Sequence, residues 1–131
     1  MKKLIILLAA VFVGFLFLNF SLPNSNSKVV PDENALNMTE EVKTVIDESC
    51  YGCHHTDSKN DKGKKKLNFD SFGKEYSSIK SAGKFKEIAN VIGDNDMPPS
   101  KYLEHNPEKA LTKDQKTLLI KWATSEAKNF R

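Results

Sequence analysis

Arginine is almost missing from this sequence. Its 131 residues include 20 lysines and arginines, and Arg131 is the only arginine. Lysine lacks the planar fork with which arginine recognises phosphates and base edges through paired hydrogen bonds. The formal net charge is +3, and Lys2 and Lys3 carry two of these charges, which leaves about +1 for the rest of the chain. This balance argues against a nucleic-acid-binding protein.

Cysteine is also scarce. The chain has two cysteines, Cys50 and Cys53, and only Tyr51 and Gly52 separate them. A pair this close cannot link distant parts of a fold, so a disulfide framework is excluded. The spacing favours a chemical role for the two thiols.

The longest apolar run lies at the N-terminus. Lys2 and Lys3 precede it, residues 4–18 are apolar or small, and Pro23 follows soon after. This pattern is typical of an export signal, and it approaches the roughly 20 residues of a membrane span only if it continues to residue 22. We interpret residues 1–22 as a signal peptide or membrane anchor and residues 23–38 as a polar linker. Residues 39–131 then form one domain on the periplasmic side of the inner membrane, anchored or free in the periplasm.

Apolar residues recur at helical spacing in several places in this domain. We expect one helix after Thr39, which has the chemistry of an N-cap, and a second over residues 84–92. Thr112 and Gln115 have the spacing of a capping box, and the helix after them would bury Trp122. No segment alternates apolar and polar residues like a strand, so the domain is predicted to be all-α.

The segments between these helices have weaker patterns. Residues 55–66 are polar and lysine-rich, and we expect a solvated loop there. Residues 67–79 are predicted to form an apolar patch, with a short helix broken near Gly73. Pro98 and Pro99 make residues 94–99 a rigid, extended loop.

Cys50-Tyr51-Gly52-Cys53-His54 is the attachment pattern of c-type haem. Two thiols at this spacing can form thioethers with the two vinyl groups of one porphyrin. His54 then falls next to the iron, which it can bind through one ring nitrogen while the other needs an acceptor. The motif therefore predicts one covalently attached haem c, with Cys50, Cys53 and His54 as its binding residues.

Three other interpretations of the same residues remain open. A zinc site would use the two cysteines with His54 or His55 and with His105, although no second ligand pair has the usual spacing. A thioredoxin-like redox pair would need a strand-helix-strand context. The third alternative is a chemically inert pair, which is unusual for exported thiols.

Met97 is the first candidate for the second axial ligand of the iron. It precedes Pro98 and Pro99, which would hold its loop stiffly, and a thioether ligand raises the haem potential. The alternative is that Met97 fills a gap in the core. His105 is a further candidate, His55 and Met38 are weaker ones, and an open iron site is the remaining possibility.

In its order of motifs, the chain resembles the small haem-binding domain of the cytochrome c superfamily found in exported, Bacteroidetes-type proteins. The resemblance covers residues 42–123. It is carried by the haem attachment motif, by Leu67-Asn68-Phe69, by Met97-Pro98-Pro99 and by the closing helix up to Trp122-Ala123. It implies a small cytochrome c-like helical domain wrapped around one haem, with iron bound by His54 and Met97. The short, charged segment 58–66 departs from this pattern, which leaves open which carbonyl receives the His54 N–H.

These features together predict a one-electron carrier rather than an enzyme. The alternatives are a haem peroxidase or a haem-based sensor, and both need an open iron site. We expect a redox partner protein, which would be acidic if it docks on Lys64, Lys65 and Lys66. The membrane is a second contact if the N-terminal helix is retained.

Overall fold

The computed structural model describes residues 36–130. Its elements in chain order are α2 (Glu40–Ser49), α3 (Asp61–Lys66), η1 (Phe69–Ser71), α4 (Ser78–Gly93), α5 (Ser100–Leu103), η2 (Pro107–Lys109) and α6 (Lys113–Asn129). No strand occurs in this part of the chain, which confirms the all-α prediction for it. The predicted export helix lies outside the described residues, as does most of the predicted linker. Within residues 36–130, no helix is long and apolar enough to cross a membrane.

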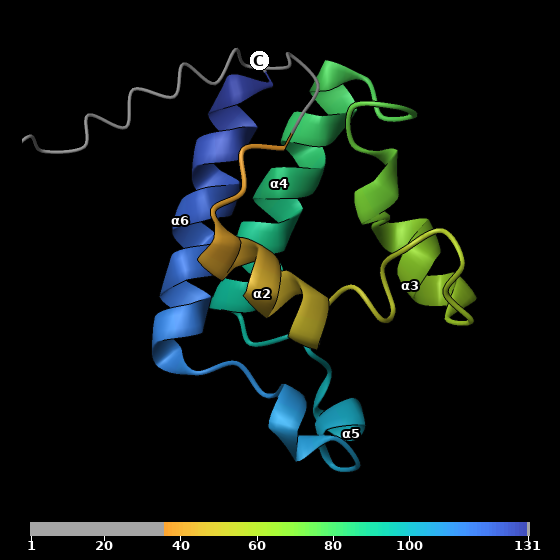
Figure 1. Cartoon of the computed structure of the whole chain (residues 1–131), viewed down its shortest axis with the longest axis vertical. Helices are drawn as coiled ribbons and strands as arrows, with labels where there is room; N and C mark the ends of the chain where they lie inside the picture. Colours follow the sequence, from red (N-terminus) through yellow and green to blue (C-terminus); the bar gives the residue numbers. More distant parts are fainter. Residues whose placement is uncertain (1–35, 131) are drawn as a thin grey trace, which may run out of the picture. The chain divides into compact units, whose positions relative to one another are not determined.

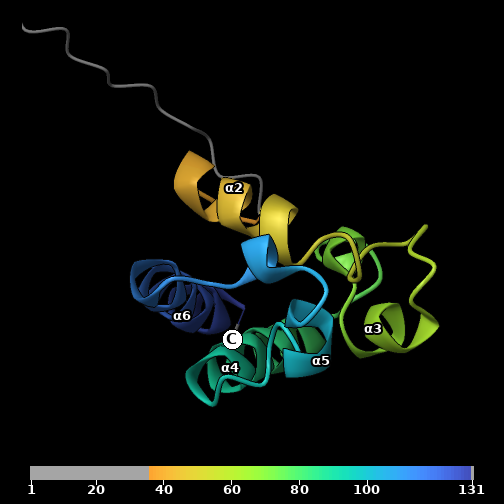
Figure 2. The ribbon, with the colours of Figure 1, turned by 90° about the horizontal axis from the view of Figure 1, so that it is seen from below.

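An antiparallel pair of helices, α4 and α6, forms the centre of the domain, and α2 lies across them (Figure 1). Phe85 of α4 is fully buried, where its ring stacks on Phe72 and meets the edge of Trp122. Aromatic rings packed in this way contribute more than their buried area alone. α3 lies on the side of α4 away from α6, as both ribbon views show (Figure 2).

The three longer helices predicted from the sequence are all present, and the short helix predicted before Gly73 is the 3-10 helix η1. Thr39 caps α2 by accepting a hydrogen bond from the Val42 N–H. Thr112 and Gln115 form the predicted capping box at the start of α6. α4 begins six residues before the predicted start at residue 84, where Ser77 caps it. Residues 78–80 are exposed, and the next two, Ser81 and Ala82, are buried but small, so no apolar period marks the true start.

The prediction of a loop over residues 55–66 was wrong in its second half, where α3 forms. The Asn60 side chain caps this short helix by accepting from the Gly63 N–H. Asp61 lies in its first turn and three lysines lie in its last turn, which suits the helix dipole at both ends. The Asn60 cap and the favourable charges at both ends therefore stabilise this helix, which has no buried apolar face.

The predicted apolar patch over residues 67–79 is also shorter than expected. Phe69 and Phe72 are buried, and Gly73 takes a positive φ of 69° in the turn that follows η1. Ile79, however, is 86% exposed at the start of α4. Tyr76, after the turn at Gly73, still packs on the core, so the patch ends between Tyr76 and Ile79.

The segment before α2 is tied to the C-terminal half of α6. The indole N–H of Trp122 donates to the Asn37 carbonyl at 3.1 Å, and the Asn37 N–H donates to Glu126 Oε2 at 3.3 Å. Leu36 and Met38 pack on the core on either side of Asn37. Trp122 is thus a core residue, as predicted, and it also holds this incoming strap of residues 36–38.

Candidate functional site

A cavity of about 600 Å³ lies where the end of α2, α3, α4 and the loop before α5 meet. This volume is within the range of roughly 300–1,000 Å³ that is usual for ligand and cofactor sites. Cys50, Cys53 and His54 line it on one side, and Met97 lines it as well. The four residues predicted from the sequence as cofactor-binding residues therefore share one cavity. Its apolar walls come from Leu67, Phe69, Ile88, Val91, Ile92 and Leu111.

A tight turn at the end of α2 carries the two cysteines. The N–H groups of Cys50 and Tyr51 both donate to the Ile46 carbonyl, and the Cys53 N–H donates to the Cys50 carbonyl at 3.1 Å. Both thiols are half-buried and unbridged. Burial, with a smaller contribution from the neighbouring Cys53, raises the pKa of the Cys50 thiol to about 12. A thiol with so high a pKa is protonated at neutral pH, unlike the thiolate of a thioredoxin-like redox pair.

The ring of His54 is oriented by two backbone carbonyls. Its Nδ1 lies 3.0 Å from the Gly63 oxygen and 3.1 Å from the Leu67 oxygen. Carbonyls only accept hydrogen bonds, so Nδ1 carries the proton and Nε2 keeps its lone pair for a metal. The sequence left this acceptor open, and the structure gives the role to Gly63 within α3 and to Leu67 directly after it.

Asp70 connects the cysteine turn to η1. One of its carboxylate oxygens accepts from the Thr56 N–H at 2.9 Å, and the other accepts from the Tyr51 hydroxyl at 2.7 Å. These two hydrogen bonds lower the pKa of Asp70 below its ordinary value. The Phe69 N–H also donates to the His54 carbonyl at 3.0 Å. The backbone on both sides of His54 is therefore fixed.

Gly63 occupies a position with no room for a side chain. A Cβ at this residue would lie 2.8 Å from the Cys53 carbonyl oxygen and 3.1 Å from the Asn60 side chain. The glycine thus allows α3 to approach the cysteine turn closely enough for its own carbonyl to reach His54. This role was not predicted from the sequence. The hint was Asn60, an N-cap residue three positions before a glycine.

We predict that Gly63→Ala destabilises the domain by about 1–3 kcal/mol, because the clash involves backbone and forces α3 away from His54. Gly83→Ala is the matched control. A Cβ on this helical glycine would meet nothing within 4 Å, so alanine there should stabilise α4 by up to about 1 kcal/mol. Chemical denaturation of the two variants measures both effects. Equal stabilities would show that the close approach at Gly63 is unimportant.

Met97 lies in the non-helical loop 94–99, as predicted, but this loop is turned rather than extended, since Asn95 has a positive φ of 62°. The Asp96 and Met97 N–H groups both donate to the Val91 carbonyl, which folds the loop back on the end of α4. Lys116 of α6 donates to the Asn95 side chain at 2.6 Å and fixes the loop from the other side. Met97 is half-buried beside Pro98, which is buried.

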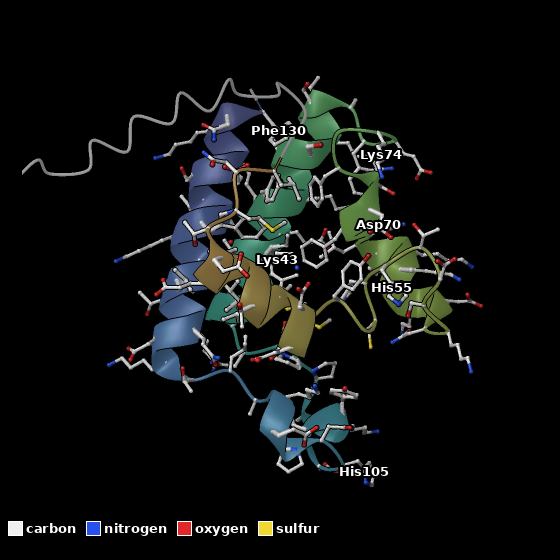
Figure 3. The ribbon with its side chains drawn as sticks, in the orientation of Figure 1. Lys43, His55, Asp70, Lys74, His105 and Phe130 are labelled. Atoms are coloured by element: carbon white, nitrogen blue, oxygen red, sulfur yellow. The ribbon has the colours of Figure 1, made fainter. Side chains whose placement is uncertain are left out.

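The other candidate ligands do not line this cavity. His55 stacks on the Tyr51 ring, and His105 is exposed at the far end of the domain beyond α5 (Figure 3). Met38 packs on the core within the strap. In residues 36–130, no group of three or more His, Cys, Asp or Glu side chains is arranged to hold a metal ion. The ligand set of the zinc alternative is therefore not assembled in this part of the chain.

The model of one protein family, described as a haem-binding domain, matches residues 56–125. The chain belongs to this haem-binding domain family. The match begins two residues after His54 and includes α3, α4, the Met97 loop and most of α6. Comparisons with curated proteins and with solved structures gave no match.

Haem is therefore the cofactor that the groups lining this cavity are expected to bind. The walls offer two thiols, an imidazole with Nε2 available, and a thioether, all set among apolar side chains. These are the groups that attach a porphyrin covalently and bind its iron in c-type cytochromes. The donor groups of this cavity fit haem, and its volume is that of an ordinary cofactor site.

Proposed function

We propose that this chain attaches one haem c covalently through thioethers to Cys50 and Cys53, with His54 Nε2 as an iron ligand. The observation that supports this most directly is the state of the His54 ring. Its Nδ1 is already engaged by the Gly63 and Leu67 carbonyls, while the side chain lines the same cavity as both cysteines. A ring held in this way presents one defined nitrogen to a metal before any cofactor binds.

Met97 completes the proposed iron site from the loop before α5. Bound haem would supply an iron that exchanges one electron with a partner. The chain would position His54 and Met97, exclude water with the apolar walls, and set the reduction potential through the thioether ligand. We therefore propose one-electron transfer without substrate turnover as the function.

Export and partner docking complete the proposal. The N-terminal apolar run would place the domain on the periplasmic side of the inner membrane, where covalent attachment of this type is completed. Lys65 and Lys66 of α3 are exposed, and Lys66 lines the cavity. An acidic redox partner approaching this side would associate faster at low ionic strength.

The decisive experiment is intact mass under denaturing conditions combined with a reduced pyridine haemochrome spectrum. The full chain is expressed with the covalent haem-attachment machinery. We expect the mass of the mature chain to increase by that of one haem, with the spectrum of a porphyrin that has lost both vinyl groups. A colourless protein, or one that releases all its haem on denaturation, would contradict the proposal.

A further inference from the structure

We propose that Lys62 and Lys66 of α3, together with Lys84 of α4, bind the two propionate carboxylates of the haem. This inference rests on the proposed function and adds the residues that recognise the acidic edge of the porphyrin. All three lysines line the cavity. They come from two helices that are separate in the sequence.

α3 presents two of its lysines to the cavity and directs the others elsewhere. Lys62 and Lys66 are four residues apart, so they share one face of the helix, and both line the cavity. Lys64 instead donates to the Ser58 carbonyl and pairs with Asp61, and Lys65 does not line the cavity. Like charges at this spacing repel each other, and an anion between them removes that cost.

Neither of these two lysines has a carboxylate partner within the described residues. The ion pairs found in residues 36–130 involve Lys43, Lys64 and Lys84. Lys84 pairs with Glu87 at 2.9 Å, and its side chain is only 19% exposed. The whole lining also contains Lys109 and the carboxylates of Asp47, Glu48 and Asp96. Within α3 and α4 themselves, three ammonium groups face one carboxylate, Glu87, and this local surplus suits a dianionic ligand.

The position of these lysines matches the chemistry of the porphyrin. Its vinyl groups and its propionates lie on opposite edges of the ring. If Cys50 and Cys53 at the end of α2 hold the vinyl edge, the propionates point away from α2. The acidic residues Asp47 and Glu48, which also line the cavity, precede Cys50 on α2 and so belong to the vinyl side. Away from these two carboxylates, the lysines of α3 and α4 that line the cavity and can meet the anionic edge are Lys62, Lys66 and Lys84.

The test uses mesohaem, in which ethyl groups replace the vinyls so that no thioether can form, and mesohaem dimethyl ester, in which both propionates are neutral. Each is titrated into the full-length apoprotein under reducing conditions. We expect the wild type to bind the free acid about tenfold more tightly than the ester. Lys62→Gln with Lys66→Gln should reduce this preference several-fold, and adding Lys84→Gln should reduce it further.

The matched control is Lys59→Gln with Lys65→Gln, which removes the same charge from exposed residues that do not line the cavity. It should keep the wild-type preference. An equal loss in the control, an unchanged preference in Lys62→Gln with Lys66→Gln, or no binding of mesohaem to the wild type would overturn this assignment. The proposed function is judged separately, by the mass of the matured protein with native haem.

Discussion

Replacing both cysteines, Cys50→Ser with Cys53→Ser, is expected to abolish covalent haem attachment completely. The serine hydroxyls cannot form thioethers with the vinyl groups, although the cavity and His54 are kept. Denaturing mass spectrometry of the matured variant should give the mass of the polypeptide alone. Any haem still present should dissociate on denaturation and show the spectrum of a porphyrin with intact vinyl groups.

Two histidine variants provide the matched control for this experiment. His54→Ala removes the ring that lines the cavity and is held by the Gly63 carbonyl. His55→Ala removes a ring that stacks on Tyr51 and does not line the cavity. We expect the first to lose attached haem or the normal spectrum of its iron, and the second to keep both. A haem-free His55→Ala protein together with a normal His54→Ala protein would reverse the assignment of the ligand.

Replacing Met97 by alanine should leave the haem attached and change its electronic properties. The oxidised protein should lose the absorption band that arises from a methionine sulfur bound to iron. Its potential should fall by on the order of 0.1 V, a part of the roughly 0.8 V over which axial ligands set haem potentials. Absorption spectroscopy and a redox titration of the matured protein measure the two effects.

Met38→Ala is the matched control for Met97→Ala. Met38 is also half-buried, but it packs on the core within the strap and does not line the cavity. Its loss should reduce stability, by up to several kcal/mol if the site cannot repack, without changing the spectrum or the potential. An unchanged sulfur-to-iron band in Met97→Ala would reject Met97 as the second ligand.

The sequence predicted those parts of the structure that depend on local patterns. Thr39 and Thr112 were recognised as helix caps, because capping needs only a hydroxyl a few residues before an apolar period. The cavity residues Cys50, Cys53 and His54 were nominated by their spacing, and Met97 by the two prolines after it. The structure brings these four side chains to one cavity, but their roles in binding haem stay predictions.

The parts that were missed either lack an apolar period or depend on contacts between segments. α3 has no apolar period, and its stability comes from the Asn60 cap and from charges that suit the helix dipole. α3 contributes to the site through the Gly63 carbonyl. Every residue has this backbone group, so the residue type does not reveal its role. Only the lack of space for a Cβ, 2.8 Å from Cys53, makes glycine necessary there. Such a constraint becomes visible only when the cysteine turn and α3 are placed together.

The strap formed by residues 36–38 fixes the end of the domain at which the chain enters it. Trp122 and Glu126 hold Asn37 against the C-terminal half of α6, and Phe130 stacks on Phe85 near the same end. Both ends of the described chain thus leave the helix pair at one end, and α5 and η2 lie at the other (Figure 1). A purification tag or a fused protein after residue 131 would therefore sit at the end of the domain where residue 36 enters it. It would leave the α5 end free to meet other molecules.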